Sequence, residues 1–417
     1  MSAVLSGAAA QVASAAEATS PGNPLCGRDM LCFSHDWNGD PLSKTHLMRL
    51  LARDNRILWV NSIGYRAPTV SRRDLNRAVG KVIEAAAPVR EVEPNLHVLS
   101  PLVIPAYGSK WIREFNRWFL CQQVRRAMRA LGFSRPVNWI FNPAAAMVAG
   151  SLDEDLLVYY CVDEYSAFSG VAGEQLATLE RDLMAKADLV VVSSERLLHA
   201  KRRHNPRTSL VRHGVDWSHF RRAIESRGPA LDIPHELAKL PRPVLGYFGL
   251  IAEDWVDVEL VAHVARALPE ASIAMLGRVT MDVSALKRLP NVHLLGRQPY
   301  SSLPAYCKGF DAALIPFPIN EATLNANPLK AREYLAAGLP VVSTAIPEVE
   351  VLPGCRIGRS REEFVREVVA SLGTPGPSAG RSDAIRHESW EARLDSIRGL
   401  VAEVVASRGA RNDRRAA

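Results

Sequence analysis

Lys330 and Glu333 have the residue types and spacing that a nucleotide-diphosphate site needs. They lie three residues apart near the start of a predicted helix, so their side chains share one face. Asn327 is a good N-cap, Pro328 suits the first helical position, and Gly338 supplies the left-handed residue that ends the helix. The N-terminal N–H groups and the ammonium would bind a diphosphate, and the carboxylate would bind sugar hydroxyls one turn later.

The segment around this helix resembles the donor-binding helix of GT-B glycosyltransferases, especially the family 4-like (group 1) enzymes. The resemblance rests on Pro328-Leu329-Lys330 and on the run Glu333-Tyr334-Leu335-Ala336-Ala337-Gly338-Leu339-Pro340-Val341-Val342. It implies that Glu333 binds the ribose hydroxyls of a nucleotide sugar. The family often has another glutamate eight positions earlier, which contacts the donor sugar. This chain has Asn325 there, which we expect to bind the donor, with Glu321 further upstream; the change leaves open the sugar and the stereochemical course.

Four further residues in the second half of the chain are candidates for the donor site: Tyr247, Gly249, Arg278 and Phe317. The run Gly246-Tyr247-Phe248-Gly249 resembles the first donor-side loop of the family, although a tight strand-to-helix turn explains the same glycines. Arg278 could assist Lys330 at the diphosphate or simply lie in solvent. Phe317 follows a predicted buried strand, where it would line the base pocket or pack in the core.

In the first half, an apolar strand ends in Asp163 and Glu164, where a general base could face the cleft. This segment resembles one in the xanthan-type glucuronosyltransferases, in which an aspartate is the catalytic base, and Asp163 is the matching residue. In a retaining enzyme Asp163 would instead orient or bind the acceptor. If the chain stays extended, Glu164 should point away from Asp163.

The acceptor-side candidates follow the first predicted strand. His35, Asp36 and Gly39 lie in a polar loop that leads into a helix containing His46. The carboxyl end of a first strand is where α/β architectures build sites. Similar segments in the family face the acceptor and the donor phosphate. A position on the helix surface would also explain His46.

The predicted helix Lys110–Leu131 mixes aromatic and basic residues. These are Trp111, Phe115, Trp118 and Phe119, among Arg113, Arg117, Arg125, Arg126 and Arg129. Such a helix can dock on an anionic membrane surface, which would suit a lipid-linked acceptor. A core helix with an arginine-rich solvent face explains the same residues.

Composition narrows the function classes. The 417 residues are 47% hydrophobic and 23% charged, as expected for a globular protein of two domains. The net charge of +7 is spread along the chain without a nucleic-acid motif, so we expect no nucleic-acid partner. The six cysteines form no C-x-x-C pair, and no zinc-type histidine cluster or strand-end Asp-x-Asp is present, so we expect no metal and no cofactor.

Short apolar runs alternate with helical patterns, which is typical of a parallel-sheet α/β architecture. The predicted strands are Met30–Ser34, Arg56–Asn61, Asn138–Phe141, Leu156–Tyr160, Leu189–Ser193, Ser209–Arg212, Val244–Phe248, Ser272–Leu276, Val292–Leu295, Ala312–Ile315 and Val341–Ser343. Predicted helices besides those already named are Thr45–Arg53, Gly173–Ala187, Glu362–Leu372 and Glu391–Ala406.

The resemblance implies a GT-B fold, in which two doubly wound Rossmann-like domains face each other across a cleft. We expect the following division of the chain: a disordered leader (1–24), an acceptor-side domain (25–222), a linker (223–243), a nucleotide-sugar-binding domain (244–375), helices that cross back to the first domain (376–406) and a disordered tail (407–417).

Together these features predict a metal-independent, hexosyltransferase-type glycosyltransferase of cell-surface polysaccharide synthesis. It would move a sugar from a UDP- or GDP-linked donor to a hydroxyl of a glycan or lipid-linked acceptor. We expect it in the cytoplasm, with contact to the inner face of the membrane. A sugar-nucleotide epimerase of similar fold and a catalytically inactive sugar-nucleotide-binding subunit are the alternatives. The sequence leaves open the sugar, the base, the acceptor, the stereochemical course and the oligomeric state.

Overall fold

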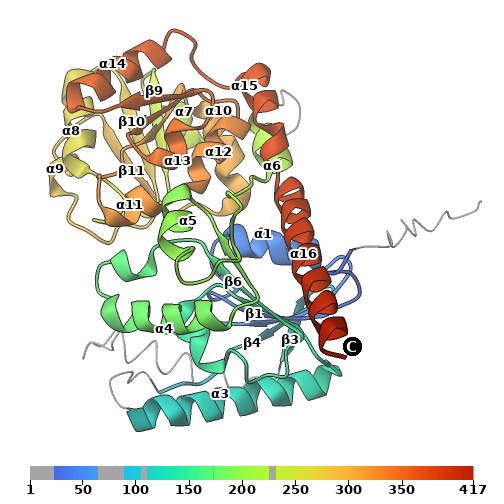
Figure 1. The fold of residues 1–417 in the computed structure, drawn as a ribbon. Helices are drawn as coiled ribbons and strands as arrows, with labels where there is room; N and C mark the ends of the chain where they lie inside the picture. The colour runs from blue at the N-terminus through green and yellow to red at the C-terminus, as the bar shows by residue number, and fades with distance from the viewer. Residues whose placement is uncertain (1–22, 64–88, 105–109, 172, 225–231, 417) are drawn as a thin grey trace, which may run out of the picture.

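The computed structural model describes residues 23–63, 89–104, 110–171, 173–224 and 232–416, which form two α/β units with one main sheet each (Figure 1). The strand order is β3-β4-β2-β1-β5-β6-β7-β8 in the first sheet and β11-β10-β9-β12-β13-β14 in the second. Neighbouring strands are parallel except for β3 and β4. The predicted pair of doubly wound α/β domains is confirmed.

The first sheet consists of β1 (Asp29–Phe33), β2 (Arg56–Val60), β3 (Arg90–Glu93), β4 (Leu96–Leu99), β5 (Val137–Ile140), β6 (Leu156–Cys161), β7 (Leu189–Val192) and β8 (Thr208–Leu210). The second consists of β9 (Val244–Phe248), β10 (Ser272–Leu276), β11 (Val292–Gly296), β12 (Ala312–Ile315), β13 (Val341–Thr344) and β14 (Cys355–Gly358). The central strands are buried along their whole length, as parallel strands covered by helices on both faces must be.

The main helices of the first unit are α1 (Ser43–Leu51), α3 (Lys110–Leu131), α4 (Gly173–Lys186) and α5 (Glu195–Lys201). The second unit and the connections contain α6 (Trp217–Arg221), α7 (His235–Ala238), α8 (Val258–Ala267), α9 (Ser284–Lys287), α10 (Leu303–Gly309), α11 (Glu321–Asn325), α12 (Leu329–Ala336), α13 (Pro347–Glu350), α14 (Arg361–Ser371) and α15 (Ala379–Ala384). The last helix, α16 (Trp390–Ala416), returns along the first unit.

The first sheet separates two cores, and strand β1 shows how. Met30 faces a core that contains residues of α1 and α16, whereas Leu31 faces a core that contains residues of α3 and α4. Successive side chains of a strand point to opposite faces, so this apolar strand stabilises both cores. Leu394 and Ile397 anchor α16 to the first unit, as the predicted crossing-back of the last helices requires.

The linker prediction (223–243) needs correction, because residues within it and just before it pack in the second core. Phe220 and Ala223 precede residues 225–231, which lie outside the described residues, and Leu237 of α7 follows them. All three side chains are buried in the second core. Within the predicted linker, α7 is therefore part of the second unit.

Three edge or near-edge strands were missed, and the tail prediction was wrong. Strand β3 reads Arg-Glu-Val-Glu, whose charges suit the edge of a sheet but hide the apolar signal. β4 and β14 are likewise short. Residues 407–416 continue α16 rather than forming a disordered tail, and Arg408 forms an ion pair with Asp188. The leader through residue 22 lies outside the described residues.

Candidate active site

A cavity of about 800 Å³ lies between the two units, at the carboxyl ends of their strands. The first unit contributes the loop after β1 and the segment after β6. The second contributes the segments after β9, β10 and β11 and the start of α12. The predicted site residues that line this cavity are His35, Gly39, Asp163, Gly249, Arg278, Phe317, Asn327, Lys330 and Glu333. The structure therefore brings most of the predicted donor and acceptor residues together.

The start of α12 faces this cavity, but Asn327 does not cap it. The N-cap is Pro328, and no side chain bonds to this helix end. The Asn327 amide instead donates to the carbonyl of Ser193 in the first unit (2.7 Å). Its side-chain oxygen accepts from the guanidinium of the fully buried Arg332 (2.6 Å). Asn327 thus ties the start of α12 to the first unit and leaves the first N–H groups of the helix free of a side-chain cap.

Lys330 points its ammonium towards two aromatic rings. Its Nζ lies 4.5 Å from the ring centre of Phe317 and 5.2 Å from that of Tyr247. Burial lowers the pKa of Lys330 to about 8, and the carboxylate of Glu333 opposes this shift. Tyr247 is buried beside Lys330 and donates its hydroxyl to Leu250, so it does not line the cavity. Phe317 likewise lies against the ammonium, so the structure does not identify it as a base-stacking residue.

Glu333 is buried one turn after the start of α12 and lines the same cavity. Burial raises its pKa to about 7, and the nearby Lys330 ammonium opposes the shift. The hydroxyl of Tyr300, which also lines the cavity, is buried without a hydrogen-bond partner. Burial is the main cause of the raised pKa of Tyr300, and the charge of Glu333 adds to it. A ligand hydroxyl between these two groups would satisfy both.

Two glycines bring backbone close to the cavity. Gly249 has φ +136°, and a Cβ there would lie 3.2 Å from Lys330 Nζ. Gly277 has φ +155°, and a Cβ there would lie 1.8 Å from the carbonyl oxygen of Gly249. Any side chain at Gly277 would therefore displace the Gly249 loop. The neighbouring Arg278 lines the cavity but is exposed, consistent with either predicted position for it.

Asp163 faces the cavity from the first unit, and Lys44 at the start of α1 is its charged neighbour. Burial raises the pKa of Asp163 to about 6, while the Lys44 ammonium lowers it. Burial also lowers the pKa of Lys44, and the Asp163 carboxylate is the main opposing influence. The two residues therefore stabilise each other's charged forms in a site where solvent contributes little.

The carboxylate of Glu164 does not line the cavity, although the chain bends at Asp163 and does not stay extended as the prediction assumed. Its carboxylate accepts from the buried ammonium of Lys201 (2.7 Å), which also donates to Glu180 (2.8 Å). This ion-pair network lies behind β6 and does not line the cavity. It fixes the chain on one side of Asp163, so that only one of the two adjacent carboxylates is available to a ligand.

The loop after β1 divides its predicted residues. His35 lines the cavity, and its buried Nε2 has no hydrogen-bond partner. Burial lowers the pKa of His35 to about 3, so the imidazole is neutral. Gly39 also lines the cavity, whereas the carboxylate of Asp36 accepts from the backbone N–H of Ser62 (3.1 Å) and does not line it. Asp36 holds the loop to the chain after β2.

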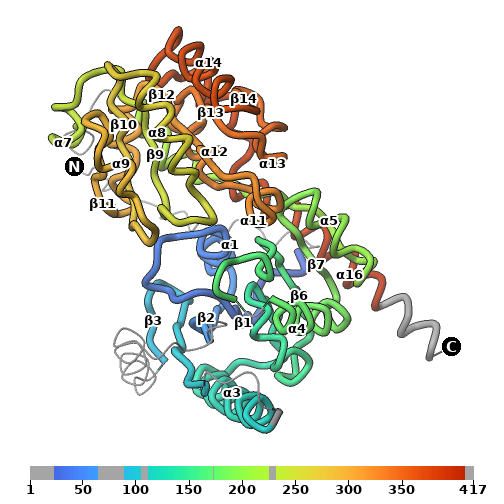
Figure 2. Tube along the Cα trace, turned by 90° about the vertical axis from the view of Figure 1, so that its left-hand side faces the viewer, coloured from blue at the N-terminus to red at the C-terminus, as the bar shows by residue number. Residues whose placement is uncertain are grey.

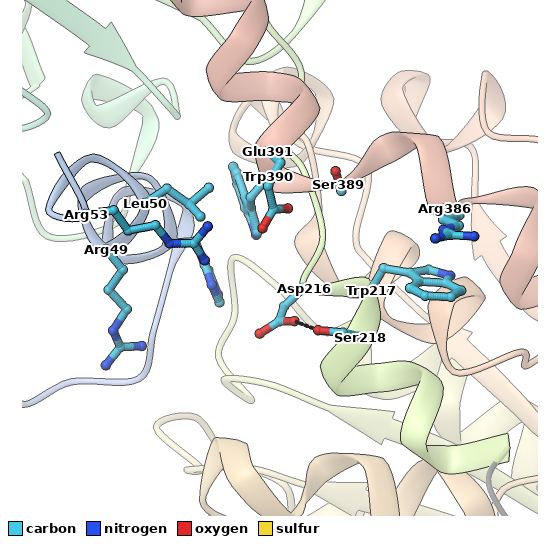
Figure 3. A pocket seen from close by; sticks show the side chains of 11 residues that line it. Arg49, Leu50, Arg53, Asp216, Trp217, Ser218, Arg386, Ser389, Trp390 and Glu391 are labelled. Carbon is cyan, nitrogen blue, oxygen red and sulfur yellow. Dashed lines mark hydrogen bonds between the residues drawn. The ribbon is translucent and has the colours of Figure 1, made fainter. Parts of the chain in front are cut away.

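His46 lies outside this cavity, in the wall of a second one of about 590 Å³. Figure 3 shows ten other residues that line this second cavity. The His46 ring stacks on Trp390 with centroids 5.4 Å apart, and it contacts Tyr300 at 5.8 Å. Tyr300 lines the first cavity, so these two rings separate the two spaces. Figure 3 shows Arg53 directed towards Trp390 and Arg49 directed away from it. The predicted acceptor role of His46 is therefore not supported by its position.

Asn325 does not line the cavity either. Its side-chain amide donates to the backbone carbonyl and the carboxylate of Glu321 (both 2.8 Å). The backbone carbonyl of Asn325 accepts from the hydroxyl of Ser194 (2.7 Å). The side chain therefore completes the end of α11. The residue at the position of the family's first glutamate holds the two units together instead of reaching the cavity.

Sequence reasoning missed several groups in the cavity wall. These are Lys44, Arg297, Tyr300 and His213, whose buried Nε2 has no hydrogen-bond partner. Arg297 forms an ion pair with Asp40 of the first unit (2.6 Å). Lys44 lies at the end of the polar segment after the first strand, which the sequence already indicated as a site through His35, Asp36 and Gly39. Arg297 and Tyr300 follow β11 without any motif and become visible only when the two units are brought together.

The cavity combines a cationic helix start, a buried carboxylate on each unit and unpaired hydrogen-bonding groups. The ammonium of Lys330 and the free N–H groups of α12 suit a diphosphate, and the two carboxylates suit hydroxyls. Among the described residues, no group of three or more His, Cys, Asp or Glu side chains is arranged to hold a metal ion. The arrangement suits binding of a nucleotide sugar with transfer between its two sides.

Comparison with known proteins shows which proteins this chain resembles. Residues 242–372 match the family model described as "Glycosyl transferases group 1". The chain is 26% identical over 228 residues to a Bacillus subtilis (strain 168) protein named as the teichuronic acid biosynthesis glycosyltransferase TuaH. The match covers 50% of this chain and 55% of that protein, so it spans only about half the length of this relative.

Solved structures share the fold across nearly the whole chain. Sucrose-phosphate synthase from Thermosynechococcus elongatus has a TM-score of 0.65 at 15% identity, over 91% of this chain and 100% of that one. HepE from Anabaena, in complex with UDP-glucose, has a TM-score of 0.62 at 13% identity, with the same coverage. Residues 242–372 of this chain are therefore similar to group 1 glycosyltransferases, and the described chain as a whole has the GT-B fold.

Proposed function

We propose that this protein is a glycosyltransferase that moves a sugar from a nucleotide-diphosphate donor to an acceptor hydroxyl. One observation carries the proposal: Lys330 and Glu333 of the second unit and Asp163 of the first line a single cavity. The helix start and Lys330 supply positive charge for a diphosphate, Glu333 supplies an acceptor for ribose hydroxyls, and Asp163 faces them from the opposite unit. The group 1 match over residues 242–372 supports the same reaction class.

The donor would be held mainly by the second unit. The diphosphate would lie at the start of α12, where it would receive hydrogen bonds from free N–H groups and from Lys330. Glu333 in its carboxylate form would accept from two ribose hydroxyls. As the bond between the sugar and the diphosphate breaks, negative charge grows on the leaving oxygen. The helix N–H groups and Lys330 would stabilise that charge without reorganising, which lowers the barrier.

The acceptor would be activated from the first unit. In an inverting transfer, Asp163 takes the proton of the acceptor hydroxyl, the oxygen attacks the anomeric carbon, and the nucleotide diphosphate leaves. Asp163 must be ionised for this step, and Lys44 favours its ionised form. The unpaired Nε2 atoms of His35 and His213 are further hydrogen-bonding groups for the substrates. In a retaining transfer, the same carboxylate would orient the acceptor.

The finer assignments belong to the same proposal. We infer a UDP-linked hexose ahead of a GDP-linked one, because HepE, which shares the fold, is in complex with UDP-glucose. We infer a glycan or lipid-linked acceptor in surface polysaccharide synthesis, because the matched Bacillus relative is named for teichuronic acid biosynthesis. We also infer a metal-independent reaction at the cytoplasmic face of the membrane, since Lys330 and the helix start supply the positive charge that a metal would otherwise supply.

The test is a turnover assay with a panel of UDP- and GDP-sugars. The purified chain is incubated with each donor, with and without glycan and glycolipid acceptors, and released nucleotide diphosphate is measured. Release that requires an acceptor is the expected result. An epimerised donor sugar would support an isomerase instead, and donor binding without release would support a binding subunit. Repeating the positive reaction in the presence of a chelator tests metal independence.

A further inference from the structure

Helix α3 carries its aromatic residues on the exposed face. Leu120 and Val124 face the core of the first unit and are fully buried. Trp111, Phe115 and Trp118 are 87%, 45% and 57% exposed. An ordinary surface helix packs its large apolar side chains inward and its charges outward. Helix α3 therefore packs on the core, but its solvent face carries exposed aromatic residues as well as arginines.

The exposed residues form one continuous stripe. Trp111, Phe115, Trp118, Arg126 and Arg129 follow one another at intervals of four, three, eight and three residues, so each lies near the same side of the helix. The stripe is aromatic towards the start of the helix and basic towards its end. Both arginines are exposed, and neither forms an ion pair or hydrogen bond within the described part of the chain.

Packing holds the aromatic half of this stripe in place. The ring centres of Phe115 and Trp118 lie 5.9 Å apart, and Phe119 stacks beside Phe115 at 5.7 Å. Ile104, which is 45% exposed, is joined to α3 because its backbone carbonyl accepts from the amide of Asn116 (2.7 Å). These contacts hold the exposed apolar side chains in place on the surface of the first unit. We call Ile104, Trp111, Phe115, Trp118, Arg126 and Arg129 the α3 face.

We propose that the α3 face docks on a membrane surface that contains anionic lipids. Trp111, Phe115 and Trp118 would lie among the headgroups, where aromatic side chains are favoured, and Arg126 and Arg129 would bind lipid phosphates. The charge of α3 favours an anionic membrane over a second copy of the chain as the partner of this surface. The sequence of α3 has six basic residues and one acidic residue, so a second copy of the chain would bring like charges together. An anionic surface neutralises them.

The position of α3 is compatible with docking. Figures 1 and 2 show it at the end of the first unit that lies away from the second unit. No α3 residue lines either cavity, so docking would leave both open. No helix within the described residues is long and apolar enough to span a membrane, so α3 would lie on the surface. Docking itself does not require the transfer reaction, although its use with a lipid-linked acceptor rests on the proposed function.

Vesicle co-sedimentation of the full chain tests this proposal. Vesicles of phosphatidylcholine alone are compared with vesicles in which one third of the lipid is phosphatidylglycerol. We expect binding to the anionic vesicles that weakens as salt is added. Arg126→Gln with Arg129→Gln should weaken it about 25-fold, at about fivefold for each arginine. Trp111→Ser with Trp118→Ser should weaken it by about tenfold or more, because the aromatic anchors are lost.

Matched controls change similar exposed residues on the second unit. Val351→Ser with Val369→Ser removes exposed apolar side chains, and Lys287→Gln with Arg288→Gln removes two basic ones. Both double variants should bind vesicles like the unchanged protein. Equal binding to neutral and anionic vesicles, or unchanged binding by both α3 variants, would overturn the proposal. A dimer that only the tryptophan variant dissociates, with vesicle binding unchanged, would overturn it in favour of self-association. Donor affinity, measured without vesicles, reports on the proposed function separately.

Discussion

The ammonium of Lys330 lies 4.5 Å from the centre of the Phe317 ring, in a cavity wall where burial has removed most of its water. The electron-rich ring face replaces part of that lost hydration. Burial still lowers the pKa of Lys330 to about 8. A donor diphosphate would therefore meet a cation that is weakly hydrated before binding, which makes the charge of Lys330 both effective and sensitive to pH.

We predict that Lys330→Ala impairs turnover more than donor binding, because charge on the diphosphate grows as the bond to the sugar breaks. In the unchanged protein, Lys330 is charged below pH 8 and loses its proton above it, so donor affinity should fall as pH rises above about 8. Lys330→Arg should restore turnover only partly but abolish this fall, because a guanidinium remains charged. Calorimetric titrations between neutral and alkaline pH, beside turnover at saturating donor, measure both effects.

A second prediction concerns Glu333 and the ribose. Glu333→Gln should weaken donor binding by about 1.5–3 kcal/mol, because a charge-assisted hydrogen bond becomes a neutral one. The penalty should be smaller for a donor that lacks the ribose 2′-hydroxyl, since that donor has already lost part of the interaction. Glu362→Gln, at an exposed carboxylate on the second unit, is the matched control. Equal penalties for the two donors in calorimetry would remove Glu333 from the ribose site.

A third prediction concerns stability. Asn327→Ala should lower the free energy of unfolding by about 1–3 kcal/mol, because the buried Arg332 guanidinium and the Ser193 carbonyl each lose a partner. Asn327→Asp should restore the bond to Arg332 but not the one to Ser193, since a carboxylate cannot donate. Denaturant titration of the unchanged protein and the two variants measures their free energies of unfolding. An Asn327→Ala protein as stable as the unchanged one would contradict the bridging role of Asn327.

The end of α12 was predictable from sequence, whereas its beginning was not. Gly338 has φ +77°, and the N–H groups of Gly338 and Leu339 bond to the carbonyls of Leu335 and Tyr334, which is the helix end that the glycine indicated. Asn327 has the residue type of an N-cap, but its amide bonds across the interface. Local propensity cannot anticipate a partner that lies 134 residues away in the chain.

In the candidate site, too, some residues were predictable from sequence and others were not. Residues at strand ends and on α12 were found because a parallel sheet places ligands at its carboxyl edge. Lys44 and Tyr300 were not assigned roles, because their neighbours across the cavity come from distant segments. His46 had a suitable residue type and place in the chain, but its ring stacks on Trp390 beside the second cavity. Position along a helix did not determine which of the two cavities it faces.

The fourth prediction tests Asp163 against its neighbour Glu164. If Asp163 is the base of an inverting transfer, Asp163→Asn should lower turnover by about 10²–10⁴-fold while donor affinity changes little. Glu164→Gln should affect turnover much less, because Glu164 faces the buried Lys201 rather than the cavity. That variant removes a buried ion-pair partner and should cost stability, so rates are compared per folded molecule.

The pH dependence of kcat/KM identifies the carboxylate that acts. The pKa of Asp163 is about 6, so protonation should remove the base and lower kcat/KM as pH falls below that value. Lys44 lowers that pKa, so Lys44→Met should move the decline to higher pH. The Glu164 charge raises it, so Glu164→Gln should move the decline to lower pH. NMR of the product then shows whether the configuration at the anomeric carbon is inverted or retained. Inversion of the anomeric configuration would support the role of Asp163 as base. Retention of that configuration, together with an Asp163→Asn variant that changes mainly the KM for the acceptor, would assign Asp163 to acceptor binding. Full activity in Asp163→Asn would exclude both roles.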